Sequence, residues 1–366
     1  MANKKKILIF HPTVAPYRVD FFNDLSKIFD IQLCICDVYS DTFDYTKIYS
    51  LLDFEPILFK SHTKVLTKAF WKMIDLSTPD IVMVSEFGYG TISVLLHRKI
   101  KKKCYKIISI CDDSYNMLVE GNDFSLKHKW ARRYLSPLMD DIIVVEPMVE
   151  KWYQGKYKKG FFFPIIRDAI KQRNVYQHVL SDSVELMHNN HLDSKNVFLY
   201  VGRFVALKNI ETIIKAFSSI DQKENVLILV GSGDEEMKLK RLVSDLNVNA
   251  IFTGRLEGNA LYAWYNVADY FVMASYQEAF GAVTNEALLA GCYCLISSKA
   301  GSNCLIEEGK NGFTFSPMDI GELTEKMKRI IEAFPTKRPL EQVKPNLMSI
   351  DYEITMKNLI EHIKSM

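Results

Sequence analysis

The fold class is decided by the stretch Ala268-Asp-Tyr-Phe-Val-Met-Ala-Ser-Tyr-Gln-Glu-Ala-Phe-Gly-Ala-Val-Thr-Asn-Glu-Ala-Leu-Leu-Ala-Gly291. It opens with an apolar run typical of a buried β-strand. A loop with Glu278 and Gly281 follows, and a segment with helical periodicity begins near Ala282. A buried strand that leads through a short loop into a helix is the repeating unit of a parallel α/β sheet.

The same alternation extends in both directions from this stretch. In the first half, strands are expected at Lys6–Phe10, Ile31–Cys36, Ile81–Val84, Tyr105–Cys111 and Asp141–Val145. In the second half they are expected at Asn196–Val201, Val226–Val230, Ala250–Thr253, Tyr270–Ala274, Tyr293–Ile296 and Gly312–Phe315. Longer helical segments separate them, which predicts parallel sheets with helices on both faces.

The alternation breaks between Phe161 and Ser194, where Pro164 and two His-Asn clusters interrupt it. We therefore expect two Rossmann-like, doubly wound α/β domains, residues 1–185 and 186–349. A C-terminal helix at about 350–366 is expected to pack back on the first domain. Ligands bind such sheets at the carboxyl ends of the strands, so two facing domains would enclose a cleft with one substrate on each wall.

Composition places the chain among ordinary globular proteins. Of its 366 residues, 48% are hydrophobic and 25% are charged, and no apolar run reaches the roughly 18 residues of a membrane span. The basic start is followed by an apolar run too short for a signal peptide, so we expect a cytoplasmic protein. The seven cysteines show no C-x-x-C spacing, which argues against a zinc or redox site.

The formal net charge is only +2, but residues 1–180 hold 27 Lys and Arg against 20 Asp and Glu. A basic half suits a phosphate-bearing or membrane-surface partner. With so small an overall charge and no RNA or DNA motif, nucleic acid is not expected as a partner.

A second informative stretch is Tyr200-Val-Gly-Arg-Phe-Val-Ala-Leu-Lys-Asn209. A strand ends at Val201, Gly202 permits the turn, and a helix begins near Asn209. Arg203 and Lys208 thus flank a strand-to-helix corner. The forked guanidinium of arginine and the compact ammonium of lysine together suit the binding of a diphosphate. The alternative is two solvated cations in a loop.

Glu278 and Glu286 stand eight residues apart around the second strand-to-helix junction. Because helical side chains lean toward the N-terminus, Glu286 can reach back over the helix mouth, where Gly281 presents bare backbone N–H. Carboxylates accept hydrogen bonds from ribose and sugar hydroxyls, and a helix end takes phosphate. The spacing alone is weak, since Glu353 and Glu361 share it on an expected solvated helix.

Taken in order, these motifs resemble the family-four retaining glycosyltransferases, which have the GT-B fold. The resemblance covers roughly 198–315 through Gly-Arg-Phe-x3-Lys at 202–208, Val-Gly-Ser-Gly-Asp at 230–234, Phe-Thr-Gly-Arg at 252–255, Glu-x7-Glu at 278–286 and Glu-Gly-x2-Gly at 308–312. It implies sugar transfer from a nucleotide-sugar donor, a UDP- or GDP-sugar, with retained anomeric configuration.

The resemblance also implies roles for individual residues. Arg203, Lys208 and Glu278 become the catalytic set, with Arg203 and Lys208 on the donor diphosphate and Glu278 on the transferred sugar. Glu286 is implied on the ribose hydroxyls. The remaining implied donor contacts are Gly202, Phe280, Gly281, Ala282 and Val283, with the backbone near Arg255 at the base.

The first half resembles that family only loosely, through His11-Pro-Thr-Val-Ala-Pro-Tyr-Arg. The glycine-rich loop common there is missing, and the stretch where many relatives carry a histidine offers Asp112 and Asp113 instead. His11, Tyr17, Arg18 and these two aspartates are therefore candidates for the acceptor side. Each aspartate suits a helix N-cap equally well, and His11 suits a structural role.

The chain holds no Asp-x-Asp motif, so neither metal nor other cofactor is expected. Arg203 and Lys208 can stabilise the leaving diphosphate, and no carboxylate stands out as a nucleophile, which favours attack on the donor's leaving face. Alternatives are a sugar-nucleotide epimerase of the same fold, a catalytically silent sugar-binding relative and, on the weak Gly231-Ser-Gly233 signal, a nicotinamide dehydrogenase.

Basic and aromatic residues are interleaved at 127–134 and 151–159. Such patches can rest on anionic lipid, which suggests peripheral membrane contact at the inner face and a lipid-linked or oligosaccharide acceptor in polysaccharide biosynthesis. The alternative is two solvated helix faces with ordinary core aromatics.

Overall fold

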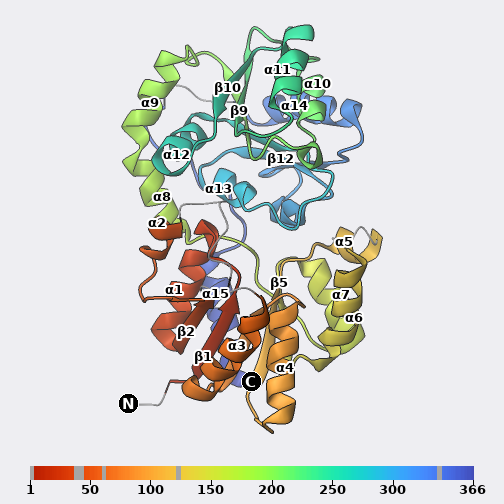
Figure 1. Cartoon of the computed structure of the whole chain (residues 1–366). Coiled ribbons are helices and arrows are strands. Elements are labelled where there is room, and N and C mark those ends of the chain that lie inside the picture. Colours follow the sequence, from red (N-terminus) through yellow and green to blue (C-terminus); the bar gives the residue numbers. More distant parts are fainter. Residues whose placement is uncertain (1–3, 37–44, 60–62, 121–124, 336–339) are drawn as a thin grey trace. The chain divides into compact units, whose positions relative to one another are not determined.

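A computed structural model describes residues 4–36, 45–59, 63–120, 125–335 and 340–366. The chain divides into two compact units: unit 1, Met1–Arg167 with Tyr352–Met366, and unit 2, Asp168–Asp351. Each is described by itself (Figure 1).

Unit 1 is built on a parallel seven-stranded sheet with the order β3-β2-β1-β4-β5-β6-β7. The five strands expected from the sequence are present, and two short edge strands are added that are too short to show periodicity. The strands are β1 Lys6–His11, β2 Asp30–Ile35, β3 Ile57–Leu58, β4 Ile81–Ser85, β5 Lys106–Cys111, β6 Asp141–Val144 and β7 Phe161–Phe162.

The helices of unit 1 cover both faces of this sheet, because its residues alternate in direction. Leu8 and Phe10 pack with α3, α4 and α7, whereas Phe22 of α1 is buried outside that cluster. The helices are η1 Pro16–Arg18, α1 Val19–Ile28, α2 Tyr45–Tyr49, α3 Thr63–Ser77, α4 Tyr89–Ile100, α5 Tyr115–Glu120, α6 Leu126–Leu135, η2 Ser136–Leu138, α7 Pro147–Tyr157 and α15 Tyr352–Ser365.

Unit 2 has a parallel six-stranded sheet with the order β10-β9-β8-β11-β12-β13. Counted from the first strand, this is 3-2-1-4-5-6, the order of doubly wound nucleotide-binding domains. All six strands were expected. They are β8 Asn196–Val201, β9 Asn225–Val230, β10 Ala250–Gly254, β11 Tyr270–Met273, β12 Tyr293–Ser297 and β13 Gly312–Phe315.

The helices of unit 2 also lie on both faces of its sheet. Phe198 and Tyr200 pack with α10, α11 and α14, while Phe271 meets Tyr265 of α12 on the other face. The helices are α8 Ala169–His178, α9 Leu180–Asn189, η3 Ala206–Lys208, α10 Ile210–Phe217, α11 Glu236–Asp245, α12 Gly258–Val267, α13 Val283–Leu289, η4 Gly301–Leu305 and α14 Ile320–Ala333.

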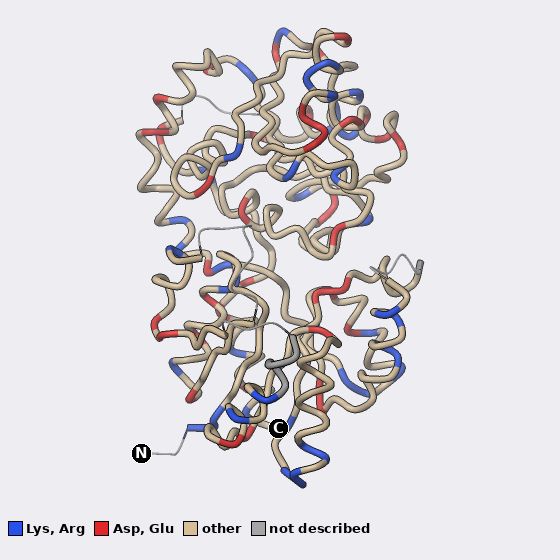
Figure 2. Tube along the Cα trace, viewed as in Figure 1, with Lys and Arg blue, Asp and Glu red and all other residues tan. Residues whose placement is uncertain are grey.

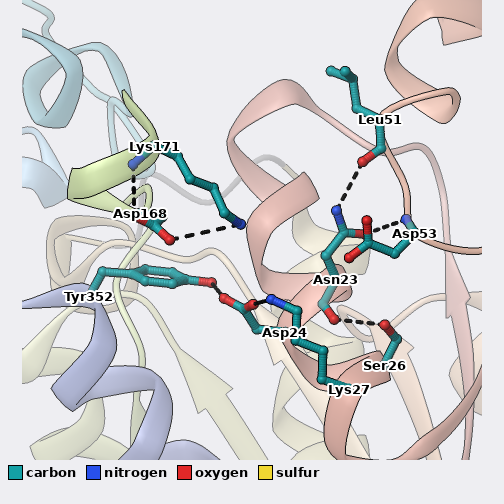
Figure 3. A network of polar contacts seen from close by, with 9 residues as sticks. All are labelled: Asn23, Asp24, Ser26, Lys27, Leu51, Asp53, Asp168, Lys171 and Tyr352. Carbon is teal, nitrogen blue, oxygen red and sulfur yellow. Dashed lines mark hydrogen bonds and ion pairs between the residues drawn. The ribbon is translucent and has the colours of Figure 1, made fainter. Parts of the chain in front are cut away.

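The division falls at Arg167/Asp168 instead of near residue 185. The polar segment that suggested a linker forms α8 and α9, and α8 is tied into unit 2. Arg173 donates to Leu289 O and Lys344 O, both at 2.9 Å, and Asn266 donates to Tyr176 O at 2.8 Å. Asp168 caps α8 by accepting from Lys171 N at 3.0 Å (Figure 3).

Helix α15 returns to unit 1, although 184 residues of unit 2 precede it in the chain. The Tyr352 hydroxyl donates to Asp24 Oδ2 of α1 at 2.8 Å (Figure 3), and Lys5 Nζ donates to Lys364 O at 2.8 Å. His362 pairs with Asp141 of β6 and stacks on Phe161. Within the described ranges, no helix combines the length and the apolar character needed to cross a membrane.

Candidate functional site

In unit 2 the strand order reverses between β8 and β11, and the loops that follow these two strands meet there. Tyr276 N donates to Leu207 O at 3.0 Å, which joins the two loops through their backbones. The strand ends at such a reversal are where doubly wound sheets bind ligands. The residues expected at the site from the sequence lie largely on these loops.

Asn209 holds the two loops together, a role the sequence analysis missed. Its backbone is left-handed, with φ +54°, and its side chain is buried. The amide Nδ2 donates to Ala274 O at 3.0 Å, just past β11, and to Pro317 O at 2.9 Å. Asparagine tolerates the left-handed region, and its position between Lys208 and a helix was the only available signal.

Lys208 and Glu278 form an ion pair across the two loops, and their side chains are only 18% and 19% exposed. Arg203 precedes them on the β8 loop and is exposed, and no ion pair in the described part of the chain involves it. The Arg203 carbonyl accepts from the Tyr200 hydroxyl at 3.1 Å. The corner thus carries one paired cation and one cation without a counterion.

The loop from Glu278 to Ala282 is fixed against η4. Gly301 N donates to Glu278 O at 3.1 Å, and Ser302 N donates to Phe280 O at 2.7 Å. Gly281 adopts φ +94°, a left-handed backbone conformation in which any other side chain would be strained.

Beyond this glycine the chain enters α13, which has only seven residues. The backbone N–H groups of Gly281, Ala282 and Val283 donate to no other group among the described residues. Phe280 itself is buried.

Glu286 lies in the first turn of α13, as expected, and buried tyrosines hold it from behind. The Tyr265 hydroxyl donates to Glu286 Oε2 at 3.2 Å, and the Tyr176 hydroxyl donates to Glu286 O at 2.8 Å. Burial, and then the charge of Glu286, raise the pKa of Tyr265 well above its usual value, so it stays a donor. The sequence carried no signal for either tyrosine, because their partner stands 21 or more residues away.

Arg255 lies at the end of a different strand from the other donor-side candidates. It follows β10, which β9 separates from β8 in the sheet. Its guanidinium contacts Glu257 Oε1 at 2.5 and 2.9 Å on the exposed surface. Only the backbone near Arg255 was expected at the site, and Gly254 O accepts from Gly231 N at 2.9 Å nearby.

In unit 1, the candidate residues lie at the ends of β1 and β5. Arg18 NH2 contacts Asp112 Oδ1 at 2.5 Å, with Arg18 buried and Asp112 37% exposed. His11 ends β1, and its Nδ1 donates to Thr13 O at 2.5 Å. Burial and the charge of Arg18 lower the pKa of His11 to about 4, so its ring is neutral. Tyr17 lies beside Arg18 in η1 and is half-buried.

Asp113 is buried, at 1% exposure, and forms ion pairs with α6: 2.8 Å to Arg132 and 3.4 Å to His128. Burial would raise the pKa of Asp113, but these partners outweigh it and hold the pKa below its usual value. Asp112 is therefore the accessible carboxylate of the two. At the start of α5, Tyr115 N donates to Glu146 Oε2 at 2.7 Å.

Two further carboxyls complete this edge of unit 1, and the sequence analysis missed both. Glu86 follows β4 and accepts from Asp112 N at 2.8 Å, while its Oε2 is buried without a hydrogen-bond partner. Burial, and then Asp113 and Asp112, raise the pKa of Glu86 to about 8. Burial raises that of Glu146 to about 7. A glutamate directly after a buried strand was the available signal.

Potential ligand atoms of Glu86, Cys111 and Asp113 lie within 4.8 Å of one another. They suit a metal poorly as arranged. Burial raises the pKa of the Cys111 thiol well above its usual value, and Asp113 already pairs with Arg132. Metal ligands must be deprotonated, so a cation would compete with two protons and an arginine.

Residues 185–342 match the family model "Glycosyl transferases group 1". The second unit belongs to this family. All ten residues implied as donor contacts, from Gly202 to Glu286, lie inside the matched range. The five candidates in unit 1 lie outside it.

Individual relatives agree with this glycosyltransferase assignment. An uncharacterized glycosyltransferase of Methanocaldococcus jannaschii is 32% identical over 142 residues, which are 38% of this chain and 36% of the relative. Another from the same organism is 24% identical over 78% of this chain and 75% of its own length. The chain thus spans little more than a third of the first of these relatives.

The fold extends over both units. The structure of HepE from Anabaena in complex with UDP and glucose superposes with a TM-score of 0.77 at 16% identity, covering 99% of this chain and 100% of that one. Together with the parallel sheets of seven and six strands, this shows the two-domain α/β GT-B fold that the glycosyltransferase resemblance implied.

Proposed function

We propose that the chain transfers a sugar from a nucleotide-sugar donor to an acceptor hydroxyl, with retained configuration and without a metal. The observation that carries this proposal is the Lys208–Glu278 pair at the strand reversal of a glycosyl transferase domain. It sets a cation for phosphate beside a carboxylate for sugar hydroxyls. The solved relative with UDP and glucose supports a UDP-sugar as the first donor class to test.

In this proposal Arg203 and Lys208 bind the donor diphosphate. Arg203 has no counterion in the described part of the chain, so a bound phosphate would supply one. The N–H groups of Gly281, Ala282 and Val283 add backbone donors for phosphate and sugar oxygens. Glu278, released from Lys208 by the incoming phosphate, accepts from the sugar hydroxyls, and Glu286 accepts from the ribose.

The chemical step breaks the bond between the anomeric carbon and the phosphate oxygen and forms one to the acceptor oxygen. Negative charge develops on the diphosphate as the ring gains oxocarbenium character. In this proposal Arg203 and Lys208 stabilise that charge without a metal. The leaving phosphate oxygen takes the acceptor proton when attack occurs on the same face, which retains the configuration. Activity should therefore persist in EDTA.

The acceptor side of the proposal rests on unit 1. Asp112, held by Arg18 and 37% exposed, is the accessible carboxylate among the unit 1 candidates and can accept from an acceptor hydroxyl. We propose a saccharide acceptor, free or linked to lipid, in polysaccharide or glycoconjugate biosynthesis, with the chain working at the cytoplasmic membrane face.

Thermal-shift measurements with UDP, GDP, ADP, CMP and dTDP test the donor site in the absence of metal. Ligand at about 100 times its Kd stabilises by about 2.7 kcal/mol. We expect one nucleotide to shift the wild type and Glu286→Ala to abolish that shift. Glu361→Ala is the matched control, because Glu353 and Glu361 share the same spacing on α15.

A shift retained by Glu286→Ala would contradict the ribose role, and no shift with any nucleotide would contradict the donor site. Turnover then separates the remaining alternatives. Release of the nucleoside diphosphate only when an acceptor is added supports sugar transfer. Conversion of the sugar nucleotide by itself indicates the epimerase, and binding without turnover indicates a silent sugar-binding relative.

A further inference from the structure

Helices α4 and α6 of unit 1 each present an apolar stripe to solvent. On α4 the exposed large side chains are Tyr89, Ile92, Leu96 and Ile100. On α6 and η2 they are Leu126, Trp130, Tyr134 and Leu138. Their spacings of three and four residues place each set on one side of its helix. The apolar stripe of a surface helix ordinarily packs against the core. Two stripes exposed to solvent therefore indicate an interaction surface.

The two stripes form one continuous face. A cavity of about 400 Å³ lies between them, with Ile92, Leu95 and Leu96 on the α4 side and Leu135 and Leu138 on the other. Arg98 fixes the arrangement by donating to Leu138 O at 3.0 Å and pairing with Asp140. We call this surface, α4 with α6 and η2, the docking face.

The docking face is strongly cationic. Residues 89–100 and 126–138, which form α4, α6 and η2, contain six Lys and Arg but no Asp or Glu. Four of these basic side chains are exposed, namely Lys99, Lys127, Lys129 and Arg133. Figure 2 shows basic positions along α6. The acids that approach from neighbouring elements are paired, Asp140 with Arg98 and Asp75 with Lys103 at 3.9 Å.

The exposed aromatic side chains distinguish between the possible binding partners of the docking face. Trp130 and Tyr134 are 59% and 57% exposed, and their rings stack at 5.5 Å. Trp and Tyr with basic neighbours are the side chains that settle at a bilayer's headgroup level, where their polar tips stay wet. A second copy of this chain would bring the exposed Lys99, Lys127, Lys129 and Arg133 against the same four cations, so like-charge repulsion disfavours self-association.

We propose that the docking face binds the surface of an anionic lipid bilayer, with Trp130, Leu126 and Leu96 entering the interface and the lysines contacting lipid phosphates. The 127–134 part of this face was anticipated from sequence, but α4 was not. The second expected patch, 151–159, belongs to α7, where Trp152 and Tyr157 pack against the core and Tyr153 is fully buried.

The inward side of α6 adds a functional consequence. Arg132, on the side away from solvent, contacts Asp113 at 2.8 Å, directly beside Asp112. One helix therefore joins the docking face to the candidate acceptor carboxylate. Resting on the proposed function, this link favours an acceptor carried on lipid. Vesicle binding needs no donor, so its failure and that of the enzymatic proposal are distinguishable.

Co-sedimentation of the full chain with vesicles tests the proposal. We expect binding to phosphatidylcholine vesicles that contain phosphatidylglycerol, little binding to phosphatidylcholine alone, and loss of binding at 0.5 M salt. Lys127→Glu with Lys129→Glu should lower the partition coefficient at least about 30-fold, the loss expected for two basic residues near an anionic surface. Lys328→Glu with Lys357→Glu, the same charge change on α14 and α15, should lower it far less.

Fluorescence locates the bound surface independently. Lipids brominated near the headgroup should quench Trp130, and the quenching should largely disappear in Trp130→Phe while folding, judged by circular dichroism, is kept. Equal binding by both charge variants, or quenching that persists in Trp130→Phe, would overturn the assignment of this face. Dimerisation that Trp130→Ser abolishes would assign the face to a second copy and overturn the bilayer as occupant.

Discussion

At the scale of single residues, the buried acids of unit 1 differ in protonation state, which a formal charge count does not show. Glu86 and Glu146 follow buried strands, and burial raises their pKa values to about 8 and about 7. Near neutral pH Glu86 therefore holds a proton that a free glutamate would have lost, and Glu146 holds one for part of the time. Among these acids, Asp113 keeps its charge because Arg132 and His128 stand beside it.

Glu86 should make the stability of unit 1 depend on pH. Its folded pKa of about 8 lies above the unfolded value of 4.5, so the folded state binds the extra proton between these values. The contribution of Glu86 to the free energy of unfolding is then fully present below about pH 4.5 and is lost as the pH rises through 8. Glu86→Gln should remove this dependence, raising stability at pH 9 by about 1–2 kcal/mol while changing little at pH 5.

Thermal melts of wild type and Glu86→Gln from pH 5 to 9 measure this difference. Glu353→Gln, on the exposed face of α15, is the control and should leave the profile unchanged. Parallel profiles for wild type and Glu86→Gln would contradict a raised pKa.

Asn209 combines a left-handed backbone with two buried hydrogen bonds to Ala274 O and Pro317 O. Asn209→Ala loses both bonds and adds backbone strain, which predicts a loss of about 2–4 kcal/mol. Asn209→Gly loses the bonds but keeps the backbone free, so it should be about 1 kcal/mol more stable than the alanine variant. Thermal melts of the two variants measure this difference in stability. Equal stability of the alanine and glycine variants would contradict the predicted backbone strain.

At the scale of elements, helix ends need partners that sequence periodicity does not reveal. Helix α12 ends at Val267, and Lys344, 77 residues later, covers its last carbonyls. The Lys344 ammonium donates to Asn266 O at 3.0 Å and Tyr265 O at 3.3 Å and also contacts Ala268 O. A cation at a helix C-terminus also complements the helix dipole.

Lys344→Met keeps the apolar stem but leaves these carbonyls without the donor. We expect unit 2 to lose about 2–3 kcal/mol, since hydrogen bonds to charged groups contribute about 1.5–3 kcal/mol each and water replaces part of them. Lys328→Met on the exposed side of α14 is the control and should change stability by less than about 0.5 kcal/mol. Equal melting temperatures for the two variants would show that the cap contributes nothing.

At the scale of the whole molecule, the order of elements in the chain differs from their order in space. Unit 1 is completed by α15, which arrives after all of unit 2. Its contacts run to Asp24, Lys5 and Asp141, all in unit 1.

Deletion of residues 352–366 should therefore destabilise unit 1 selectively. Hydrogen exchange followed by mass spectrometry should show faster exchange in α1 and β6, where Asp24 and Asp141 lose their partners. Exchange in β8 and β11 of unit 2 should stay as in the full chain. Faster exchange in both units would indicate that α15 stabilises the molecule as a whole.

The positions of the residues at the two strand-to-helix junctions of unit 2 could be predicted because the relevant signals are local. Strand, loop and helix occur within 24 residues around Glu278 and Glu286, and the parallel sheet then places this junction beside the one at Arg203 and Lys208. The boundary near 185 was misplaced because α8 and α9 carry polar residues on their exposed sides. Their membership in unit 2 depends on Arg173 and Tyr176, which contact residues far along the chain.

The sequence by itself determined two doubly wound α/β units, most of their strands and the residues at the strand-to-helix junctions of unit 2. It could do so because hydrophobic periodicity and strand-to-helix corners are encoded by neighbouring residues. The tertiary structure alone decided that Asn209 and Tyr265 hold the junction, that Asp113 is closed by Arg132, and that α4 and α6 share one cationic apolar face. These features depend on side chains that only folding brings together, and on burial, which sets both their charge state and their exposure.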